Sequence, residues 1–182
     1  YTLSLHDALP ISNISQIIAM FMVAPFIKKF GKRNVLIVGS IILISSNVMF
    51  IIVGQDYIGV IFSSAIKGIG SAGIASTMFA IVSDTIEYGE WKTGYRTEGL
   101  INSASSFGFK VGNGLGSAIL GAVLSIGGYV GTSATQSDLA IVSIKVCFIY
   151  LPIFITILQI IIMSFYKLDK EYSTILNELN TK

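Results

Sequence analysis

Charged residues are scarce in this chain: only 12% of its 182 residues are Asp, Glu, Lys or Arg, whereas 53% are hydrophobic. A typical soluble domain has about 25% charged residues. With so few charges, a water-soluble fold of this size could not cover its own surface with polar groups. The mean hydropathy of +0.77 agrees with this. The composition therefore predicts a membrane protein.

Cysteine and histidine each occur only once. A single cysteine, Cys147, excludes a disulfide within the chain, and its apolar neighbours indicate a buried thiol. His6 lies in the first twelve residues, YTLSLHDALPIS, which lack an initiator Met, a basic region and a cleavage site and so do not form a signal peptide. This segment looks like translated sequencing-adapter sequence. We therefore interpret residues 1–12 as a non-native scar, exclude His6 from any site, and expect the chain to be a fragment.

Long apolar runs recur along the rest of the chain, and a membrane-spanning helix needs about 20 mostly apolar residues. We predict an all-α, polytopic membrane helical bundle over residues 13–166, followed by a tail at 167–182. The tail is expected to be a short amphipathic helix or a disordered end. The five predicted spans cover residues 13–27, 35–53, 58–83, 100–127 and 141–166.

Lysine and arginine outside the spans fall only on alternate connectors. Four basic residues lie in 28–33, two in 84–99 and three in the tail, whereas 54–57 and 128–139 have none. Basic connectors remain on the cytoplasmic side of a membrane. The pattern therefore places 28–33, 84–99 and the C-terminus in the cytoplasm. No basic tract of the kind that binds nucleic acid is present, so we expect no nucleic-acid partner.

One stretch, DTIEYGEWKTGYRTEG (84–99), gathers four of the ten carboxylates and the single tryptophan. A glycosidase-like pair, Glu87 and Glu90, would need one carboxyl that stays protonated. Lys92 and Arg96 favour the ionised form of both acids, so we expect no enzyme here. A solvated connector is the other simple interpretation. The aromatic residues of the stretch, Tyr88, Trp91 and Tyr95, indicate instead that part of it packs.

Glycine-rich patterns occur in two spans. The sequence GIGSAG (68–73) matches the dinucleotide-binding fingerprint, but that fingerprint needs a preceding strand and lies in a soluble unit. We interpret this match as a site of close helix packing. Gly108, Gly112 and Gly116 are spaced by four, so they leave one helix face almost without side chains. Such a face predicts close helix packing, either in a static interface or between helices that slide.

Lys110 lies about ten residues from either end of its predicted span. A charge at that depth costs at least about 2.5–3.5 kcal/mol and is a candidate functional group. Ser103, Ser106 and Asn113 share its helix face at spacings of three and four, and Ser105 lies nearby. This stripe predicts a substrate pathway, with a structural hydrogen-bonded seam as the alternative.

The role of Lys67 stays open, and Lys145 near a span end is expected to be an interfacial anchor.

The charged stretch 84–99 closely resembles a signature of the glycoside–pentoside–hexuronide:cation symporters, which belong to the major facilitator superfamily. The resemblance continues through FGFKVGNGLGSAILGAVLSIGGY (107–129), where that family has a lysine followed by a glycine-rich helix. It covers essentially everything from residue 13 on. It implies a fold of twelve helices in two six-helix bundles, with the sugar between them. This chain would then hold about helices 8 to 12.

The resemblance also implies roles for single residues. Lys110 would lie near the sugar and cation sites, and Ser105 and Ser106 are candidate sugar contacts. The charged stretch would form cytoplasmic salt bridges to the other half that hold the outward-facing state. Helix 10 lacks the aromatic residue that the melibiose carrier places beside its sugar, so the particular sugar stays open. The expected latch residues are Asp84, Glu87, Glu90, Lys92, Arg96 and Glu98.

By this resemblance, the expected function is symport of a glycoside, pentoside or hexuronide with Na⁺ or H⁺ by alternating access across a bacterial inner membrane. The expected partners are the sugar, the lipid bilayer and an N-terminal six-helix half. No cofactor and no metal site are expected in this fragment, because the family's cation-binding acids lie on helices 2 and 4. The alternatives are another facilitator, such as a drug or solute exporter, and a membrane-embedded carbohydrate enzyme.

Overall fold

A computed structural model describes residues 2–54, 56–133 and 135–180, which form helices and contain no strand. The predicted all-α class is confirmed. The chain also contains a π-helix over Val146–Tyr150 and a 3₁₀ turn over Leu168–Lys170. The α-helices are α1 (Thr2–Phe30), α2 (Lys32–Val53), α3 (Tyr57–Thr93), α4 (Glu98–Ile126), α5 (Asp138–Lys145), α6 (Leu151–Ser164) and α7 (Tyr172–Asn180).

Five helical segments are long and apolar enough to cross a membrane, as the sequence predicts. The fifth is continuous through α5, the π-helix and α6, from Asp138 to Ser164. The first extends from Leu9 to Phe30 and so begins inside the predicted scar. The backbone of Ser12 in this segment lies against Gly68 of α3. The foreign origin of residues 1–12 stays a prediction, because packing does not test it.

Helix α3 continues ten residues beyond the end of the span predicted at residue 83. Its 37 residues correspond to about 55 Å, well beyond a hydrocarbon core of about 30 Å. The charged stretch is therefore mostly helix rather than loop. Hydropathy marks where a membrane ends, not where a helix ends. The helix stops at Gly94, whose φ of 76° gives the left-handed cap that favours glycine.

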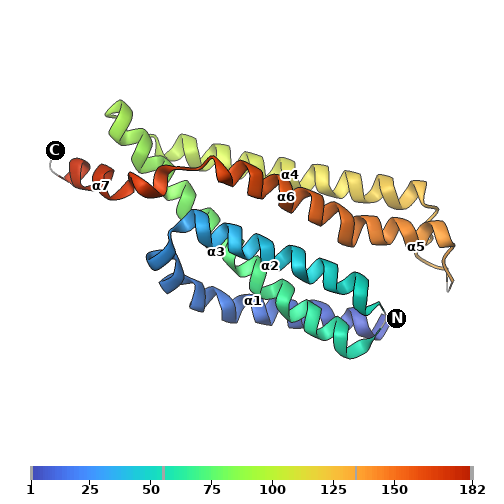
Figure 1. Cartoon of the computed structure of the whole chain (residues 1–182). Helices are drawn as coiled ribbons and strands as arrows, with labels where there is room; N and C mark the ends of the chain where they lie inside the picture. The colour runs from blue at the N-terminus through green and yellow to red at the C-terminus, as the bar shows by residue number, and fades with distance from the viewer. Residues whose placement is uncertain (1, 55, 134, 181–182) are drawn as a thin grey trace.

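Helices α1, α2 and α3 pack together, with α3 against both of the others (Figure 1). The contact of α2 with α3 is close because Gly39 and Gly70 face each other. A Cβ atom on Gly70 would lie 2.7 Å from the backbone nitrogen of Leu43. A Cβ on Gly68 would lie 2.3 Å from the carbonyl oxygen of Ser12 in α1. These contacts confirm the packing interpretation of residues 68–73.

No residue of α4 is buried, and all of its residues except Ile101, Val123 and Leu124 are exposed. It contacts α3 and α5, and in Figure 1 these contacts lie at its two ends. A Cβ atom on Gly108, Gly112 or Gly116 would meet nothing within 4 Å among the described residues. The helix against which this glycine face was predicted to pack is therefore not in the described part of the chain. That packing stays a prediction.

Candidate functional site: a polar hollow on α4 and a charged end

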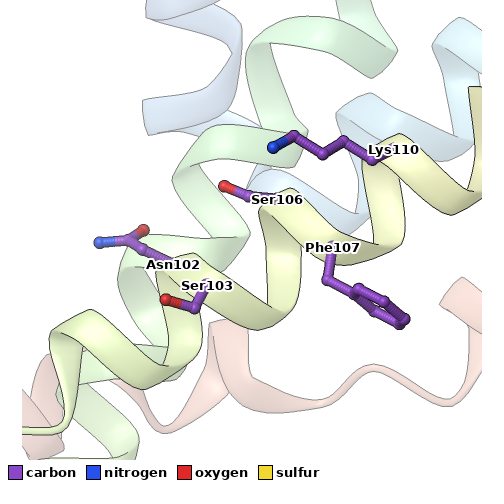
Figure 2. Close-up of a pocket in the computed structure, with 5 residues that line it drawn as sticks. All are labelled: Asn102, Ser103, Ser106, Phe107 and Lys110. Carbon is purple, nitrogen blue, oxygen red and sulfur yellow. The ribbon is translucent and has the colours of Figure 1, made fainter.

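A hollow of about 410 Å³ lies along the first half of α4. Its lining residues occur at helical spacing, on successive turns of one side. Figure 2 shows the Lys110 side chain extending back over Ser106, whereas the Phe107 ring points in another direction. The hollow is lined by Asn102, Ser103, Ser106, Phe107 and Lys110.

The lining combines one ammonium, one amide and two hydroxyl groups. All of these residues belong to α4, so the hollow is an open groove on one helix. The ion pairs among the described residues involve Lys32 and Arg96. No carboxylate of a described residue therefore lies within 4.0 Å of the Lys110 ammonium. A lysine inside a membrane span normally faces a polar cavity or pairs with an acid. The hollow can therefore donate several hydrogen bonds to a polar molecule.

The structure brings three of the five predicted substrate residues together at the hollow: Ser103, Ser106 and Lys110. Ser105 does not line it, and its hydroxyl donates to the Ile101 carbonyl of the same helix at 2.9 Å. Asn113 does not line it either. Asn102 and Phe107 were not predicted from the sequence as lining residues. Asn102 stands four residues before Ser106, so extending the polar stripe by one turn would have found it.

A second polar group occupies the end of the bundle where α1 meets α2, α3 meets α4 and α6 leads to α7; we call it the charged end. Its centre is Asp84, which is fully buried. One carboxylate oxygen of Asp84 pairs with the Lys32 ammonium at the start of α2. The other accepts a hydrogen bond from the Tyr166 hydroxyl at 3.2 Å. The Lys32 ammonium also lies 4.3 Å from the centroid of the Tyr172 ring.

Both tyrosines of the charged end are held in the protonated form. Burial raises the pKa of Tyr166 first, and the negative charge of Asp84 raises it further. Burial also raises the pKa of Tyr172, with a further rise from its hydrogen bond to Glu87. A protonated phenol is a hydrogen-bond donor, so each hydroxyl can satisfy a carboxylate here. The charged end is a hydrogen-bonded network around one buried ion pair.

The junction between α1 and α2 is fixed by residues that follow α6. Asp169 accepts a hydrogen bond from the Arg33 backbone N–H at 2.7 Å. The Arg33 guanidinium donates to the carbonyl oxygens of Met163 and Ser164 at 3.1 and 2.8 Å, which satisfies two carbonyls at the end of α6. Gly31 has a φ of 82°, and a Cβ there would lie 3.0 Å from Asp169 Oδ2. Only glycine suits this junction.

In the described part of the tail, α7 packs on α3. Trp91 Nε1 donates to Glu178 Oε2 of α7 at 2.7 Å, and Ile175 of α7 is buried. The Trp91 ring also packs against Tyr88, with ring centroids 5.9 Å apart. Tyr88 and Trp91 therefore pack as expected, whereas Tyr95 is exposed, and the stretch is not a plain solvated connector.

The predicted latch residues fall into two groups: an exposed group around Arg96, and the buried Asp84 of the charged end. Arg96 pairs with Glu90 at 2.8 Å and with Glu98 at 3.2 Å, and these contacts are largely open to solvent. The hydrogen bond to Glu90 is the main cause that raises the pKa of Arg96. Lys92 lies with its ammonium 5.7 Å from the Tyr88 ring centroid. Glu87 lies between Asp84 and Glu90 in the sequence. One of its carboxylate oxygens is buried and has no hydrogen-bond partner among the described residues.

A direct contact between Asp84 and another half of the protein would need an exposed side chain. It has no exposed surface, and both of its oxygens bond within this chain. Its partners Lys32 and Tyr166 lie 52 and 82 positions away and were not predicted from the sequence. The basic cluster at 28–33 was a signal for Lys32, but nothing local indicated which acid it would meet. The predicted latch role of these residues is not tested by these contacts.

A comparison with known protein families shows to which family the chain belongs. The model of a family described as MFS/sugar transport protein matches residues 5–170. The chain belongs to this family. Its resemblance to sugar symporters of the major facilitator superfamily is thereby confirmed, as is the expectation that it is not an enzyme. With five apolar helices, it is a multi-pass membrane protein.

Curated relatives extend the comparison. The chain is 35% identical to the isoprimeverose transporter of Lactiplantibacillus pentosus, over 98% of the chain and 39% of the relative. It is 32% identical to a putative 2,3-dihydroxypropane-1-sulfonate exporter of Escherichia coli K12, over 91% of the chain and 36% of the relative. A glucuronide carrier protein homolog of the same strain is 30% identical, over 88% and 35%. The chain thus spans less than half the length of these relatives.

Proposed function

We propose that the protein containing this chain is a secondary sugar transporter that works by alternating access, and that the hollow on α4 forms part of its substrate path. The observation that carries this proposal is Lys110, a charged residue in the middle of an apolar helix beside three polar side chains. Binding at the midplane of a bundle is the usual arrangement in such carriers. Membership of a sugar transport family supports the same function.

The substrate class proposed is a glycoside, pentoside or hexuronide, carried together with Na⁺ or H⁺. The named substrates of relatives, isoprimeverose and a glucuronide, support a carbohydrate. No acidic residue lines the hollow, so the ligands of the coupling cation would come from an N-terminal half. That half and the lipid bilayer are the proposed partners, and no cofactor is proposed.

For the charged end we propose a cytoplasmic position in a bacterial inner membrane, as the distribution of basic residues indicates. Its two groups would then have separate tasks. The buried Lys32–Asp84 pair would hold α2, α3 and the tail as one rigid unit. The exposed Arg96 group, with Glu90 and Glu98, would form the latch that contacts the other half in the outward-facing state.

Uptake by the full-length protein in cells or vesicles tests the substrate proposal. A panel of radiolabelled glycosides, pentosides and hexuronides is offered with and without a Na⁺ or H⁺ gradient. A Lys110→Ala variant should be present in the membrane but should not accumulate the sugar. Lys145→Ala, which changes an exposed lysine away from the hollow, is the matched control and should transport normally. Uphill uptake by Lys110→Ala would contradict the proposal.

A relative named as a sulfonate exporter supports a second candidate, an exporter of a small polar solute. The same vesicles distinguish the two. An importer gives sugar accumulation driven by an inward cation gradient. An exporter gives no such accumulation in right-side-out vesicles but extrudes a preloaded organic sulfonate.

A further inference from the structure

Two of the four basic residues at the junction of α1 and α2 are engaged by other parts of this chain. The Lys32 ammonium pairs with the buried Asp84. The Arg33 guanidinium donates to two carbonyl oxygens at the end of α6. The basic side chains of this cluster that remain available to bind are therefore Lys28 and Lys29.

Lys28 and Lys29 lie in the last turn of α1, and both are exposed. No carboxylate of a described residue lies within 4.0 Å of either ammonium. The sequence offers no acid nearby, because residues 8–55 contain no Asp or Glu. The apolar span Leu9–Phe30 ends at the same turn. The two lysines therefore lie where a membrane-spanning helix leaves the hydrocarbon and reaches the layer of lipid headgroups.

Two exposed phenylalanine rings lie next to this charge. Phe26 and Phe30 are one turn apart on α1, and their rings are stacked with centroids 6.2 Å apart. The residues are 51% and 50% exposed, so about half of each is open to a ligand. The Lys29 ammonium lies 5.3 Å from the Phe30 ring centroid. The end of α1 thus combines positive charge with exposed apolar area.

A phospholipid with a net negative charge matches both parts of this surface. Its phosphate oxygens accept hydrogen bonds, and a lysine ammonium has three N–H donors. Each lysine near an anionic membrane surface strengthens binding about fivefold. The upper part of the acyl chains can pack against the two rings, as apolar side chains do at the boundary between headgroups and acyl chains. A soluble anion such as inorganic phosphate offers only the polar contacts.

We propose that the end of α1 is a binding site for an anionic phospholipid. Lys28 and Lys29 bind its phosphate, and Phe26 and Phe30 contact its acyl chains. The bound lipid anchors the junction of α1 and α2 at the membrane surface. This site is separate from the hollow on α4 and does not depend on the proposed transport function.

A tryptophan reporter in the full-length protein tests the site. Phe26→Trp is reconstituted in vesicles of phosphatidylglycerol and phosphatidylcholine in equal amounts, with bromine on the acyl chains of one lipid or the other. Brominated lipid quenches a neighbouring tryptophan, and the signal of the protein without the reporter is subtracted. We expect brominated phosphatidylglycerol to quench more strongly than brominated phosphatidylcholine. This preference should fall about fivefold for each lysine removed by Lys28→Gln and Lys29→Gln.

Two variants are the controls for this experiment. Lys28→Arg/Lys29→Arg keeps both charges and should keep the preference. Lys167→Gln removes an exposed lysine of the tail, two residues before Asp169, which bonds to the α1–α2 junction. It should leave the preference unchanged, because Lys167 is not part of the site.

Four results would overturn the proposal. An equal loss of preference in Lys167→Gln would mean that general surface charge attracts the lipid. Quenching by neither lipid would show that protein covers this surface. Equal quenching by both lipids would exclude recognition of the anionic headgroup. Loss of the preference with inorganic phosphate, but not with sodium chloride at equal ionic strength, would assign the lysines to a soluble anion.

Discussion

Two lysines of this chain differ in a way that separates structure from function. Lys32 at the charged end is paired with the fully buried Asp84 and packs on a tyrosine ring. Lys110 in the middle of α4 has no acidic partner among the described residues and lines an open hollow with hydroxyl and amide groups. An ion pair such as Lys32–Asp84 can hold helices together, whereas an unpaired lysine inside a membrane span is available to bind a polar substrate. The contrast predicts that changing Lys32 affects stability and changing Lys110 affects transport.

The largest expected effect on stability is at Asp84. Asp84→Ala leaves the Lys32 charge unpaired, and removing one partner of a buried pair costs about 3–5 kcal/mol. Thermal unfolding of the full-length protein measures the loss. The double variant Lys32→Met/Asp84→Leu should recover most of it, because no charge is left unpaired. If the double variant is as unstable as Asp84→Ala, the pair does not explain the effect.

The next effect separates the glycines of α3 from those of α4. Gly70→Ala places a Cβ atom 2.7 Å from the Leu43 backbone, and overpacking of this kind costs about 1–3 kcal/mol. Gly112→Ala meets no atom within 4 Å among the described residues, so any loss of stability that it causes comes from the helix predicted to pack on this face from outside this chain. The comparison uses apparent Tm values of the two full-length variants. An equal loss for both would show that α4 packs as closely as α3, against a part of the protein outside this chain.

A smaller effect is expected where the tail meets α3. Trp91→Phe keeps an aromatic ring beside Tyr88 but removes the hydrogen bond to Glu178, at a cost of about 1 kcal/mol. The tail should then open more often, and proteolysis after residue 166 measures this. Tyr95→Phe serves as the control, because Tyr95 is exposed. Equal protease sensitivity in the two variants would mean that Trp91 does not secure the tail.

The smallest effect on stability is expected at Arg96, because its ion pairs with Glu90 and Glu98 are exposed and screened by water. Arg96→Glu should leave the Tm almost unchanged but alter the balance between inward- and outward-facing states. Reactivity of a periplasmic cysteine in the full-length protein reports that balance. A large fall in Tm, or unchanged reactivity and transport, would remove Arg96 from the proposed latch.

The local features of this protein were predictable from its sequence, and the long-range ones were not. Hydropathy located the five spans, and helical spacing placed Ser103, Ser106 and Lys110 on one side of α4. The end of α3 was missed because charged residues can continue a helix beyond the membrane. The partners of Asp84 come from other helices, 52 and 82 positions away, and only the packing of those helices brings them together.

The most direct test of the central claim is the water accessibility of α4 in the full-length protein. A Ser106→Cys variant in a Cys147→Ala background should react quickly with a water-soluble thiol reagent, and a transported sugar should slow the reaction. Ala104→Cys, two residues away on the opposite side of the helix, should react slowly and without protection. Equal rates at the two positions, with no effect of sugar, would contradict the claim that this hollow lines the substrate path.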